Sequence, residues 1–288
     1  MNTNLISSQR GKEPEDGVLY LVGTPIGNLS DISPRAINIL KNVNFIACED
    51  TRNTRKIMTK YNFKNILESF NKMNIFKKMP KIIDGLKSGK SIAIVSDAGM
   101  PSICDPGEEI VLIAKKNNIN VICVPGPCAA LTALVSSGFN SSKFVFEGFL
   151  PRKKNEREKS LYEISQRERT TVLYESPHRL KTLLEELEEH CGGKREISIS
   201  RELTKLFEEN LTNNLSQFNE MFKDQKLKGE FTIVIKGHSG EINKDFDHKN
   251  LKEDLDDLMK AGLSLSRAAK YLSKKYNLSK NIIYNLKN

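Results

Sequence analysis

The residues of this chain that could do chemistry collect in loops after short apolar runs, and residues 91–107, SIAIVSDAGMPSICDPG, form the fullest of these loops. The apolar opening is typical of a buried parallel strand, and the end predicts a helix start with a capping box and Asp105 as the cap. The roughly ten residues between exceed the ~2–6 residues of an ordinary strand-to-helix connection. Asp97, Gly99 and Ser102 lie there, at the carboxyl end of a strand, where α/β sheets bind ligands. The alternative is a long surface turn.

Two further strand-to-loop junctions are rich in glycine and proline. Residues 18–22 predict a strand that leads into GTPIGNL at 23–29, and residues 120–124 predict a strand that leads into PGPCA at 125–129. Small residues at these positions let a backbone approach a ligand closely. The first loop lacks the G-x-G-x-x-G spacing of a dinucleotide site.

A charged loop, EDTRNTR at residues 49–55, follows a predicted strand at 43–48. We expect Thr51 to cap a helix whose first turn holds Arg52 and Arg55. Cations are unfavourable at the positive end of a helix, so these arginines indicate either a pairing or anion-binding role or a structural ion-pair cluster.

Residues 84–91, DGLKSGKS, look like a phosphate-binding P-loop, but the first glycine lies one residue too close to the GKS triplet. The segment also ends a predicted helix at 73–87 instead of opening one. ATP or GTP hydrolysis is therefore not expected.

The whole chain has the composition of a soluble globular protein, with 38% hydrophobic and 28% charged residues. No apolar run approaches the ~20 residues of a membrane span, and the polar start lacks the apolar core of a signal peptide. The five cysteines include no C-x-x-C pair, so we expect neither a disulfide framework nor a zinc site, and a reducing cytoplasm fits.

Alternating strand and helix patterns predict an α/β protein of two domains with a helical tail. We expect a flexible arm at residues 1–16, α/β domains at 17–139 and 140–240, and a helical module at 248–288. Further predicted strands are residues 144–146, 171–174, 196–200 and 231–235, and predicted helices include residues 34–41, 106–117, 129–137, 180–190, 215–222, 251–259, 264–276 and 280–286.

The helical tail is strongly basic and resembles a small helix-turn-helix. From residue 258 to the end it holds seven basic and no acidic residues, against +9 for the whole chain. Such segregation favours contact with a phosphate backbone over a merely solvated charged face.

Eight loop motifs occur in order between residues 22 and 230: VGTPIGNLSDIS, ACEDTR, SDAGMPSICDPG, PGPCA, GFLPRK, YESPHRL, SRELTK and KGE. With them the chain resembles the ribosomal RNA small-subunit methyltransferase I family, the ribose 2′-O-methylating branch of the tetrapyrrole methylases. The likeness covers nearly everything after the arm, including the helical tail. YESPHRL and GFLPRK separate this branch from its porphyrin-methylating relatives.

The resemblance implies a tetrapyrrole methylase-like fold of two α/β domains with S-adenosylmethionine in the cleft between them, within a homodimer. The acceptor would be the ribose 2′-hydroxyl of a cytidine near the decoding site of 16S rRNA, in the 30S subunit, and no metal site is expected. Carried over by position, the cofactor-binding residues are Pro25, Gly27, Asp97, Ala98, Gly99, Ser102, Cys128, Ala129, Tyr174, Glu175, Glu202, Gly229 and Glu230. Met100, Cys104 and Cys128 depart from the common family spelling without altering the backbone cradle.

Methyl transfer to a ribose hydroxyl needs alignment of three atoms and a base for a weakly acidic proton. The residues expected on the acceptor side are Glu49, Asp50, Arg52, His178, Arg201 and Lys205. The base stays open among Glu49, Asp50, Asp97, Glu175, His178, Glu202 and Lys205. The residues expected to hold RNA are Arg152, Lys153, Lys154, Arg267, Lys270, Lys274 and Lys275.

Two other functions compete with this one. A methylase of small tetrapyrroles would share the cleft but would have little use for a basic tail. A non-enzymatic nucleic-acid-binding protein would explain the tail but leave the glycine and proline loops unexplained.

Overall fold

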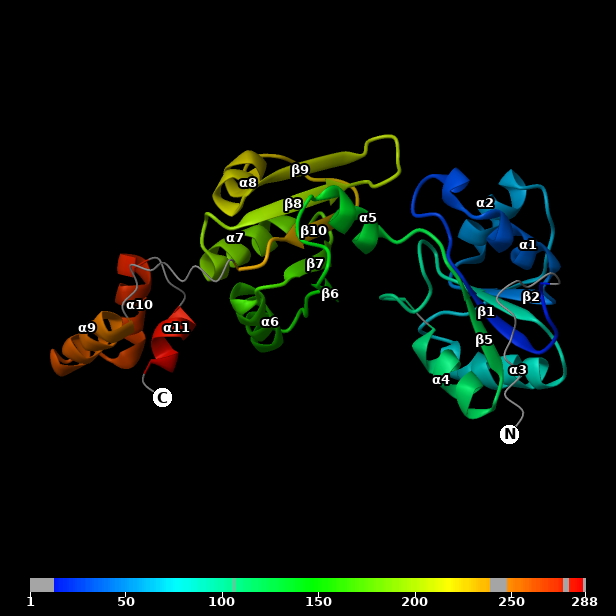
Figure 1. Cartoon of the computed structure of the whole chain (residues 1–288), viewed down its shortest axis with the longest axis horizontal. Coiled ribbons are helices and arrows are strands. Elements are labelled where there is room, and N and C mark those ends of the chain that lie inside the picture. Colours follow the sequence, from blue (N-terminus) through cyan, green and yellow to red (C-terminus); the bar gives the residue numbers. More distant parts are fainter. Residues whose placement is uncertain (1–12, 106, 239–247, 277–279, 287–288) are drawn as a thin grey trace. The chain divides into compact units, whose positions relative to one another are not determined.

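The computed structural model describes residues 13–105, 107–238, 248–276 and 280–286 (Figure 1). The chain falls into two compact units, Met1–Ala129 and Ala130–Asn288. Helix α5 (Ala129–Ser136) lies between this boundary and the boundary expected after residue 139. It packs in the second unit, where the side chains of Ala130, Ala133 and Leu134 are buried.

The first unit is built on a parallel five-stranded sheet in the order β3-β2-β4-β1-β5. Its strands are β1 (Val18–Val22), β2 (Phe45–Cys48), β3 (Leu67–Ser69), β4 (Ile92–Val95) and β5 (Asn120–Val124). The intervening helices are α1 (Pro34–Asn42), α2 (Thr51–Lys60), α3 (Ile75–Lys87) and α4 (Glu108–Lys116), with a 3-10 turn, η1, at Leu29–Asp31. All five strands run the same way, so their carboxyl ends share one edge of the sheet.

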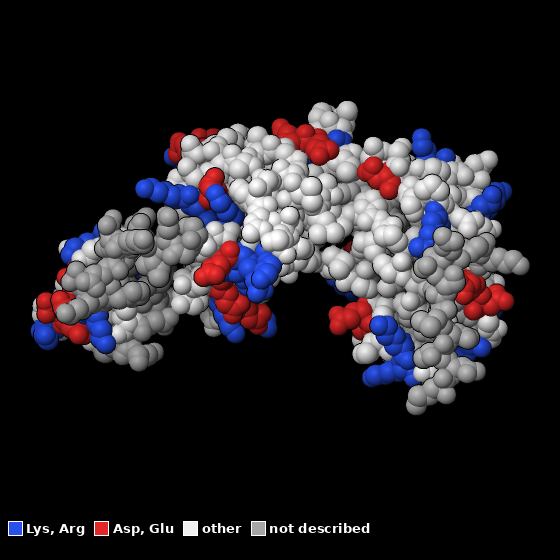
Figure 2. Space-filling model, in the orientation of Figure 1, with Lys and Arg blue, Asp and Glu red and all other residues white. Residues whose placement is uncertain are grey.

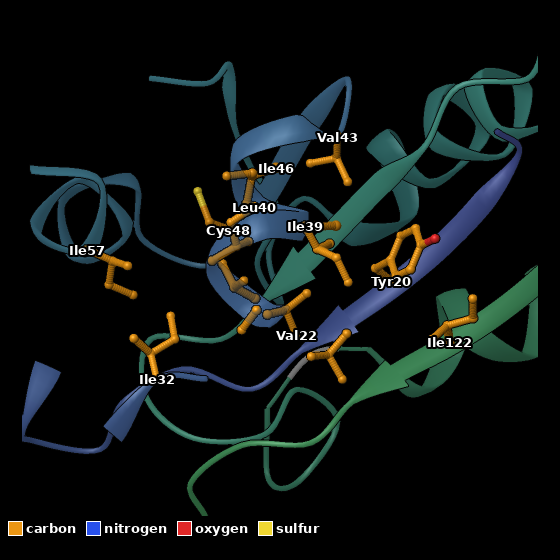
Figure 3. Packing of buried hydrophobic residues seen from close by; sticks show 14 of the residues in the cluster. Tyr20, Val22, Ile32, Ile39, Leu40, Val43, Ile46, Cys48, Ile57 and Ile122 are labelled. Atoms are coloured by element: carbon orange, nitrogen blue, oxygen red, sulfur yellow. The ribbon is translucent and has the colours of Figure 1, made fainter. Parts of the chain in front are cut away.

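Both faces of the three inner strands β1, β2 and β4 are buried, which explains why these strands are continuously apolar. Tyr20 and Val22 of β1 point into one cluster, with residues of α1 and α2 (Figure 3). Leu19 and Leu21 point into the cluster on the opposite face, with residues of α3 and α4.

Most predicted elements of this unit are confirmed, but two helix starts are not as expected. Helix α4 begins at Glu108 after Gly107 and has no side-chain cap, so Asp105 is not its cap, while Pro106 lies outside the described residues. Helix α2 is capped by Asp50, whose carboxylate accepts from the amide of Arg52, and not by Thr51. A carboxylate offsets the positive helix end better than a hydroxyl does.

The second unit holds a mixed sheet in the order β6-β7-β10-β8-β9. Its strands are β6 (Phe144–Phe149), β7 (Thr170–Glu175), β8 (Glu196–Arg201), β9 (Glu209–Asn214) and β10 (Phe231–Ile235). Only the β6–β7 pair is parallel. Helices α6 (Lys154–Gln166), α7 (Leu180–Cys191) and α8 (Leu215–Phe222) pack on one face through a leucine-rich cluster. Neither α6 nor β9 is predicted from the sequence, because both are rich in polar residues.

The helical module has a small core of its own. It consists of α9 (His248–Lys260), α10 (Leu265–Tyr276) and α11 (Lys280–Asn285), as the sequence predicts to within a few residues. The core residues are Leu251, Leu255, Ala268, Ala269, Leu272 and Ile283. In the described parts of the chain no helix is both long and apolar enough to cross a membrane.

Candidate active site

Three of the predicted loops meet at the carboxyl edge of the first sheet. The amide of Thr24 donates to the carbonyl of Gly99 at 2.9 Å, and the amide of Gly99 donates back to Thr24 at 3.1 Å. The amide of Gly23 donates to the carbonyl of Val124, the last residue of β5, at 3.2 Å. The loops after β1, β4 and β5 are therefore joined through their backbones.

Two glycines make this meeting possible. A Cβ placed on Gly23 would lie 2.7 Å from the Cα atom of Gly126, and one on Gly126 would lie 2.8 Å from the Cα atom of Gly23. Both distances are shorter than side chains tolerate. The Met100 sulfur also lies close, 2.6 Å from the Cβ position of Gly23. The first and third loops can thus pack only where both carry glycine.

The predicted cofactor residues of the first unit surround this junction. Asp97, Ala98 and Gly27 are exposed, whereas Pro25 and Gly99 are buried. The remaining three, Ser102, Cys128 and Ala129, are partly buried. The hydroxyl oxygen of Ser102 is buried and has no hydrogen-bond partner, in a loop where Ser102 itself adopts a left-handed φ of 69°. Close backbone packing at glycines, next to a buried hydroxyl without a hydrogen-bond partner, suits the binding of a small polar cofactor.

Acidic side chains from the loops after β2 and β4 lie next to this junction. The amide of Asp50 donates to Oδ1 of Asp97 at 3.0 Å. Arg52 clamps the Asp50 carboxylate through Nε and Nη2 at 2.5–3.0 Å. These hydrogen bonds hold the pKa of Asp50 down to about 2.

Glu49 and Asp105 have the opposite electrostatic environment. Burial, reinforced by the charge of Asp97, raises the pKa of Glu49. Burial, reinforced by the charge of Glu49, raises the pKa of Asp105 to about 6. Lys72, which donates to the carbonyl of Cys104 at 3.1 Å, opposes both shifts.

In the second unit, the predicted residues Glu202, Lys205 and Glu230 form one network. The Lys205 ammonium lies 3.0 Å from Oε1 of Glu202 and 2.7 Å from Oε2 of Glu230. Burial opposes ionisation of Glu202, but the bonds from Lys205 and the Glu230 amide outweigh it and lower the pKa of that carboxyl. The same two carboxylates outweigh burial at Lys205 and raise its pKa.

Backbone geometry explains the glycine of the KGE motif. Gly229 has a φ of 98°, and a Cβ there would lie 2.7 Å from Cγ of Glu202. Glu202 itself has a φ of 51°. Arg201 donates to the carbonyl of Lys228 at 2.8 Å and lies 2.8 Å from a carboxylate oxygen of Glu209, so it holds the two loops together.

Tyr174 and Glu175 make contacts within the second unit. The Tyr174 hydroxyl accepts from the Ala130 amide at 3.1 Å, and its ring packs against Phe146 and Phe149. Glu175 is 2% exposed.

Glu175 lies between two arginines. Its Oε2 atom lies 3.8 Å from Arg157 and 3.5 Å from Arg179, and Arg157 also binds Glu186 at 2.7 Å. Arg157, for which the sequence analysis predicts no role, is 8% exposed and is therefore an internal ion-pair residue. His178 is exposed on the loop that this network anchors.

The predicted RNA-binding residues are exposed where their side chains are described. Arg152, Lys153 and Lys154 precede or begin α6, and Lys153 lies 3.1 Å from Glu156. Arg267 and Lys270 lie on α10, opposite its buried alanines. The remaining two differ: Lys275 pairs with Asp254 at 2.8 Å, and the side chain of Lys274 lies outside the described residues. On the face drawn in Figure 2 the described part of the helical module carries both signs of charge.

In the part of the chain that the structure describes, no group of three or more His, Cys, Asp or Glu side chains could hold a metal ion.

The family model for Tetrapyrrole (Corrin/Porphyrin) Methylases matches residues 18–219. Proteins named ribosomal RNA small subunit methyltransferase I match most of the chain. The Synechocystis protein is 41% identical over 270 residues, covering 94% of this chain and 97% of that protein, and the Bacillus subtilis protein is 41% identical over 272 residues, covering 93% of each. The chain belongs to this methyltransferase family.

Another family member and two less similar structures match smaller parts of the chain. The family member from Thermotoga maritima is 46% identical over 221 residues, which cover 77% of this chain and 99% of that protein. Cobalt precorrin-4 methyltransferase has a TM-score of 0.59 at 14% identity, covering 76% of this chain and 95% of that one. A Thermus thermophilus uroporphyrin-III C-methyltransferase complexed with S-adenosyl homocysteine has a TM-score of 0.55 at 15% identity, covering 79% and 99%. At these identities the structures show a shared fold with this family.

The environment of Asp105 differs from the one that the sequence predicts. Its position before Gly107 is typical of a helix cap, and no local pattern reports its proximity to Glu49. The pairing of β2 with β4, in which Cys48 is opposite Val95, brings the two loops together.

Proposed function

We propose that this methyltransferase transfers the methyl group of S-adenosylmethionine to the ribose 2′-hydroxyl of a cytidine in the decoding region of 16S rRNA. The backbone junction of Thr24 and Gly99 beside the Gly23–Gly126 contact carries the proposal, because it forms a cradle without side chains at the edge where α/β sheets bind ligands. Membership in the rRNA methyltransferase family supports the acceptor.

The cofactor site is proposed to use both groups of predicted residues. In the first unit these are Pro25, Gly27, Asp97, Ala98, Gly99, Ser102, Cys128 and Ala129. In the second they are Tyr174, Glu175, Glu202, Gly229 and Glu230. Since the side chains of Tyr174 and Glu175 are engaged internally, their contribution would come through the backbone or through support of the loop. The Thermus thermophilus enzyme of the same fold, complexed with S-adenosyl homocysteine, supports this cofactor class.

Bound S-adenosylmethionine supplies a methyl group already activated on a sulfonium sulfur. The protein must then orient the ribose oxygen in line with that carbon and take up the hydroxyl proton. Glu49, Asp50, Arg52, His178, Arg201 and Lys205 are proposed to serve the acceptor side. Of these, Asp50 and Lys205 are poor proton acceptors, because Arg52 and the two glutamates hold them in their charged forms.

RNA is proposed to be held by exposed basic residues before α6 and on α10: Arg152, Lys153, Lys154, Arg267, Lys270, Lys274 and Lys275. The Thermotoga maritima relative is almost fully matched by 221 residues. The module is proposed to strengthen RNA binding and to leave the chemistry to the two α/β units, whose strands extend from β1 to β10 over residues 18–235.

The active form is proposed to be a homodimer acting in the cytoplasm, where its ribosomal substrate is found. Exposed apolar side chains support the dimer: Leu206 and Phe207 after β8 are 89% and 69% exposed, and Val135 on α5 is 75% exposed. A double change, L206S/F207S, should shift sedimentation equilibrium toward monomer. The control is F76S, since Phe76 is 74% exposed on α3 of the first unit. A monomeric wild type, or equal effects of the two variants, would contradict the dimer.

A methyl-transfer assay tests the proposed substrate. Tritiated cofactor is offered with 30S subunits lacking the modification, with naked 16S rRNA and with uroporphyrinogen. We expect label in subunit RNA that survives mild alkali cleavage beside the modified ribose. Label on the porphyrin would move the chain to the tetrapyrrole-methylating function, and cofactor binding without any label would show that the acceptor is wrong.

A further inference from the structure

The outer face of α10 in the helical module combines basic side chains with an aromatic ring. Arg267, Lys270 and Tyr271 are all exposed, and they occupy positions i, i+3 and i+4 of the helix. Residues at this spacing are neighbours on a helix surface. The buried alanines and leucine of α10 lie on the opposite face, in the core of the module. The folded module therefore leaves the basic face open to a partner.

Tyr271 is not needed for the packing of the module. It is 55% exposed. Among the described residues it has neither a ring contact nor a hydrogen bond, whereas the hydroxyls of Tyr20 and Tyr61 are hydrogen-bonded to the backbone. Tyrosine also favours a helix less than alanine does. Folding alone therefore does not explain an aromatic residue at this position.

Charge is distributed unequally between α9 and α10. Helix α10 carries four basic residues and no acidic one, whereas α9 carries three lysines and four acidic residues. The exposed carboxylates of α9, at Glu253, Asp256 and Asp257, would repel a phosphate backbone, and the outer face of α10 would attract it. The partner that fits this face is therefore a polyanion, and the ring of Tyr271 fits one that also offers flat apolar groups.

RNA with unpaired bases meets both requirements. Its phosphates bind cations, and bases that are free of a duplex stack on aromatic side chains. In an A-form duplex the bases are stacked on one another and are not open to such a ring. A stacking tyrosine would therefore distinguish unpaired RNA from duplex RNA, although both carry a charged backbone.

We propose that the ring of Tyr271 stacks on an unpaired base of the ribosomal RNA while Arg267 and Lys270 bind adjacent phosphates; this rests on the proposed function. Stacking accepts any base, because every base has a π face. The contact thus holds the module on a single-stranded segment without reading its sequence. It adds an uncharged contribution to a surface that otherwise binds through charge.

The first test compares 30S binding by the wild type, Y271F and Y271L over a range of salt concentrations. Leucine is apolar but has no π face, so Y271L should weaken binding by about 5- to 100-fold, the range for loss of one stacked base. Y271F should bind within about twofold of the wild type. Because neither variant loses a charge, the slope of log affinity against log salt should be the same in all three proteins.

The second test places a fluorescent ring at the same position. The chain has no tryptophan, so Y271W provides a single reporter whose emission falls when a base stacks on it. The control is L112W, because Leu112 on α4 is 54% exposed. One turn earlier in its helix lies Glu108, whereas Arg267 lies one turn before Tyr271. We expect naked 16S rRNA and 30S subunits to quench Y271W strongly, and a fully paired RNA duplex to quench it no more than the control.

Several outcomes would overturn the proposal. Wild-type affinity of Y271L, or equal weakening in Y271F and Y271L, would show that the ring does not stack. Equal quenching of Y271W by duplex RNA and naked 16S rRNA would indicate contact with the backbone alone, and quenching by 30S subunits but not by naked 16S rRNA would assign Tyr271 to a ribosomal protein. None of these measurements depends on methyl transfer. A wild type that passes them but labels no ribose would therefore refute the proposed function and leave the stacking contact in place.

Discussion

Gly23 and Gly126 face each other so closely that a Cβ on either would lie within 2.8 Å of the Cα atom of the other. One glycine follows β1 and the other follows β5, strands that pair along their whole length. The contact brings together two of the three loops that are proposed to bind the cofactor, and Met100 of the loop after β4 packs over it.

We therefore expect G126A to weaken cofactor binding at least about tenfold and to destabilise the protein by about 1–3 kcal/mol, the usual cost of overpacking. Isothermal titration with S-adenosylmethionine measures the first effect and urea denaturation the second. The control is G85A, a helical position whose added Cβ would meet only side-chain ends, Cδ1 of Ile92 at 3.3 Å and Cδ of Lys90 at 3.7 Å. Equal cofactor affinities of the two variants would show that the loop contact is not needed.

A second prediction concerns the buried ion pairs of the second unit. R157M removes the charge between Glu175 and Glu186 and leaves Glu175 buried with one arginine. Loss of one partner of a buried pair costs about 3–5 kcal/mol, so the free energy of unfolding should fall by about that amount. K159M is the control, because Lys159 on the same helix is 79% exposed with its carboxylate partner 3.9 Å away. If urea denaturation gives the two variants the same stability, the network does not anchor the loop.

The raised pKa of Asp105 should make the stability of the protein depend on pH. Its folded pKa, about 6, lies above the ordinary 3.8, so the folded state binds the proton more tightly. Stability from this group is full below about pH 4 and is lost as pH rises through 6. D105N should therefore raise the melting temperature at pH 8 and show a smaller gain at pH 4. An equal gain at both pH values would mean that residue 105 is not desolvated when charged.

Basic residues of α10 are expected to affect binding and not chemistry. R267A/K270A should weaken 30S binding and reduce the slope of log affinity against log salt by about 1.5, since each RNA phosphate contact contributes about 0.7–0.9. Turnover at saturating subunit should stay within about twofold. K115A/K116A removes the same charge from the end of α4. An equal loss of slope in this control would indicate a general charge effect.

The sequence was sufficient to predict a strand where a run of apolar residues is also buried in the structure. The apolar runs of β1, β4 and β10 predicted buried strands, and they are buried on both sides. The edge strand β9, ENLTNN, escaped prediction because a mostly exposed edge needs no apolar alternation. The charged helix α6 escaped for a related reason: its inward residue at position 157 is an arginine, which only a buried partner makes stable there.

The site was predictable as a set of loops but not as a set of charges. Glycine and proline residues singled out the loops after β1, β4 and β5, and the structure joins these loops through backbone hydrogen bonds. The pair of Asp50 and Arg52 lies within one motif, but the pKa of Asp105 depends on Glu49, which lies 56 positions earlier and comes near it because β2 pairs with β4. Such pairings depend on strand order, which local spacing does not encode.

Nucleoside analysis tests most directly whether the protein methylates a single ribose of 16S rRNA. 30S subunits lacking the modification are incubated with the protein and S-adenosylmethionine, and their 16S rRNA is digested and separated by mass. We predict 2′-O-methylcytidine from one position in the decoding region and none from a reaction with the cofactor omitted. A base-methylated nucleoside, or ribose methylation spread over many positions, would contradict the claim.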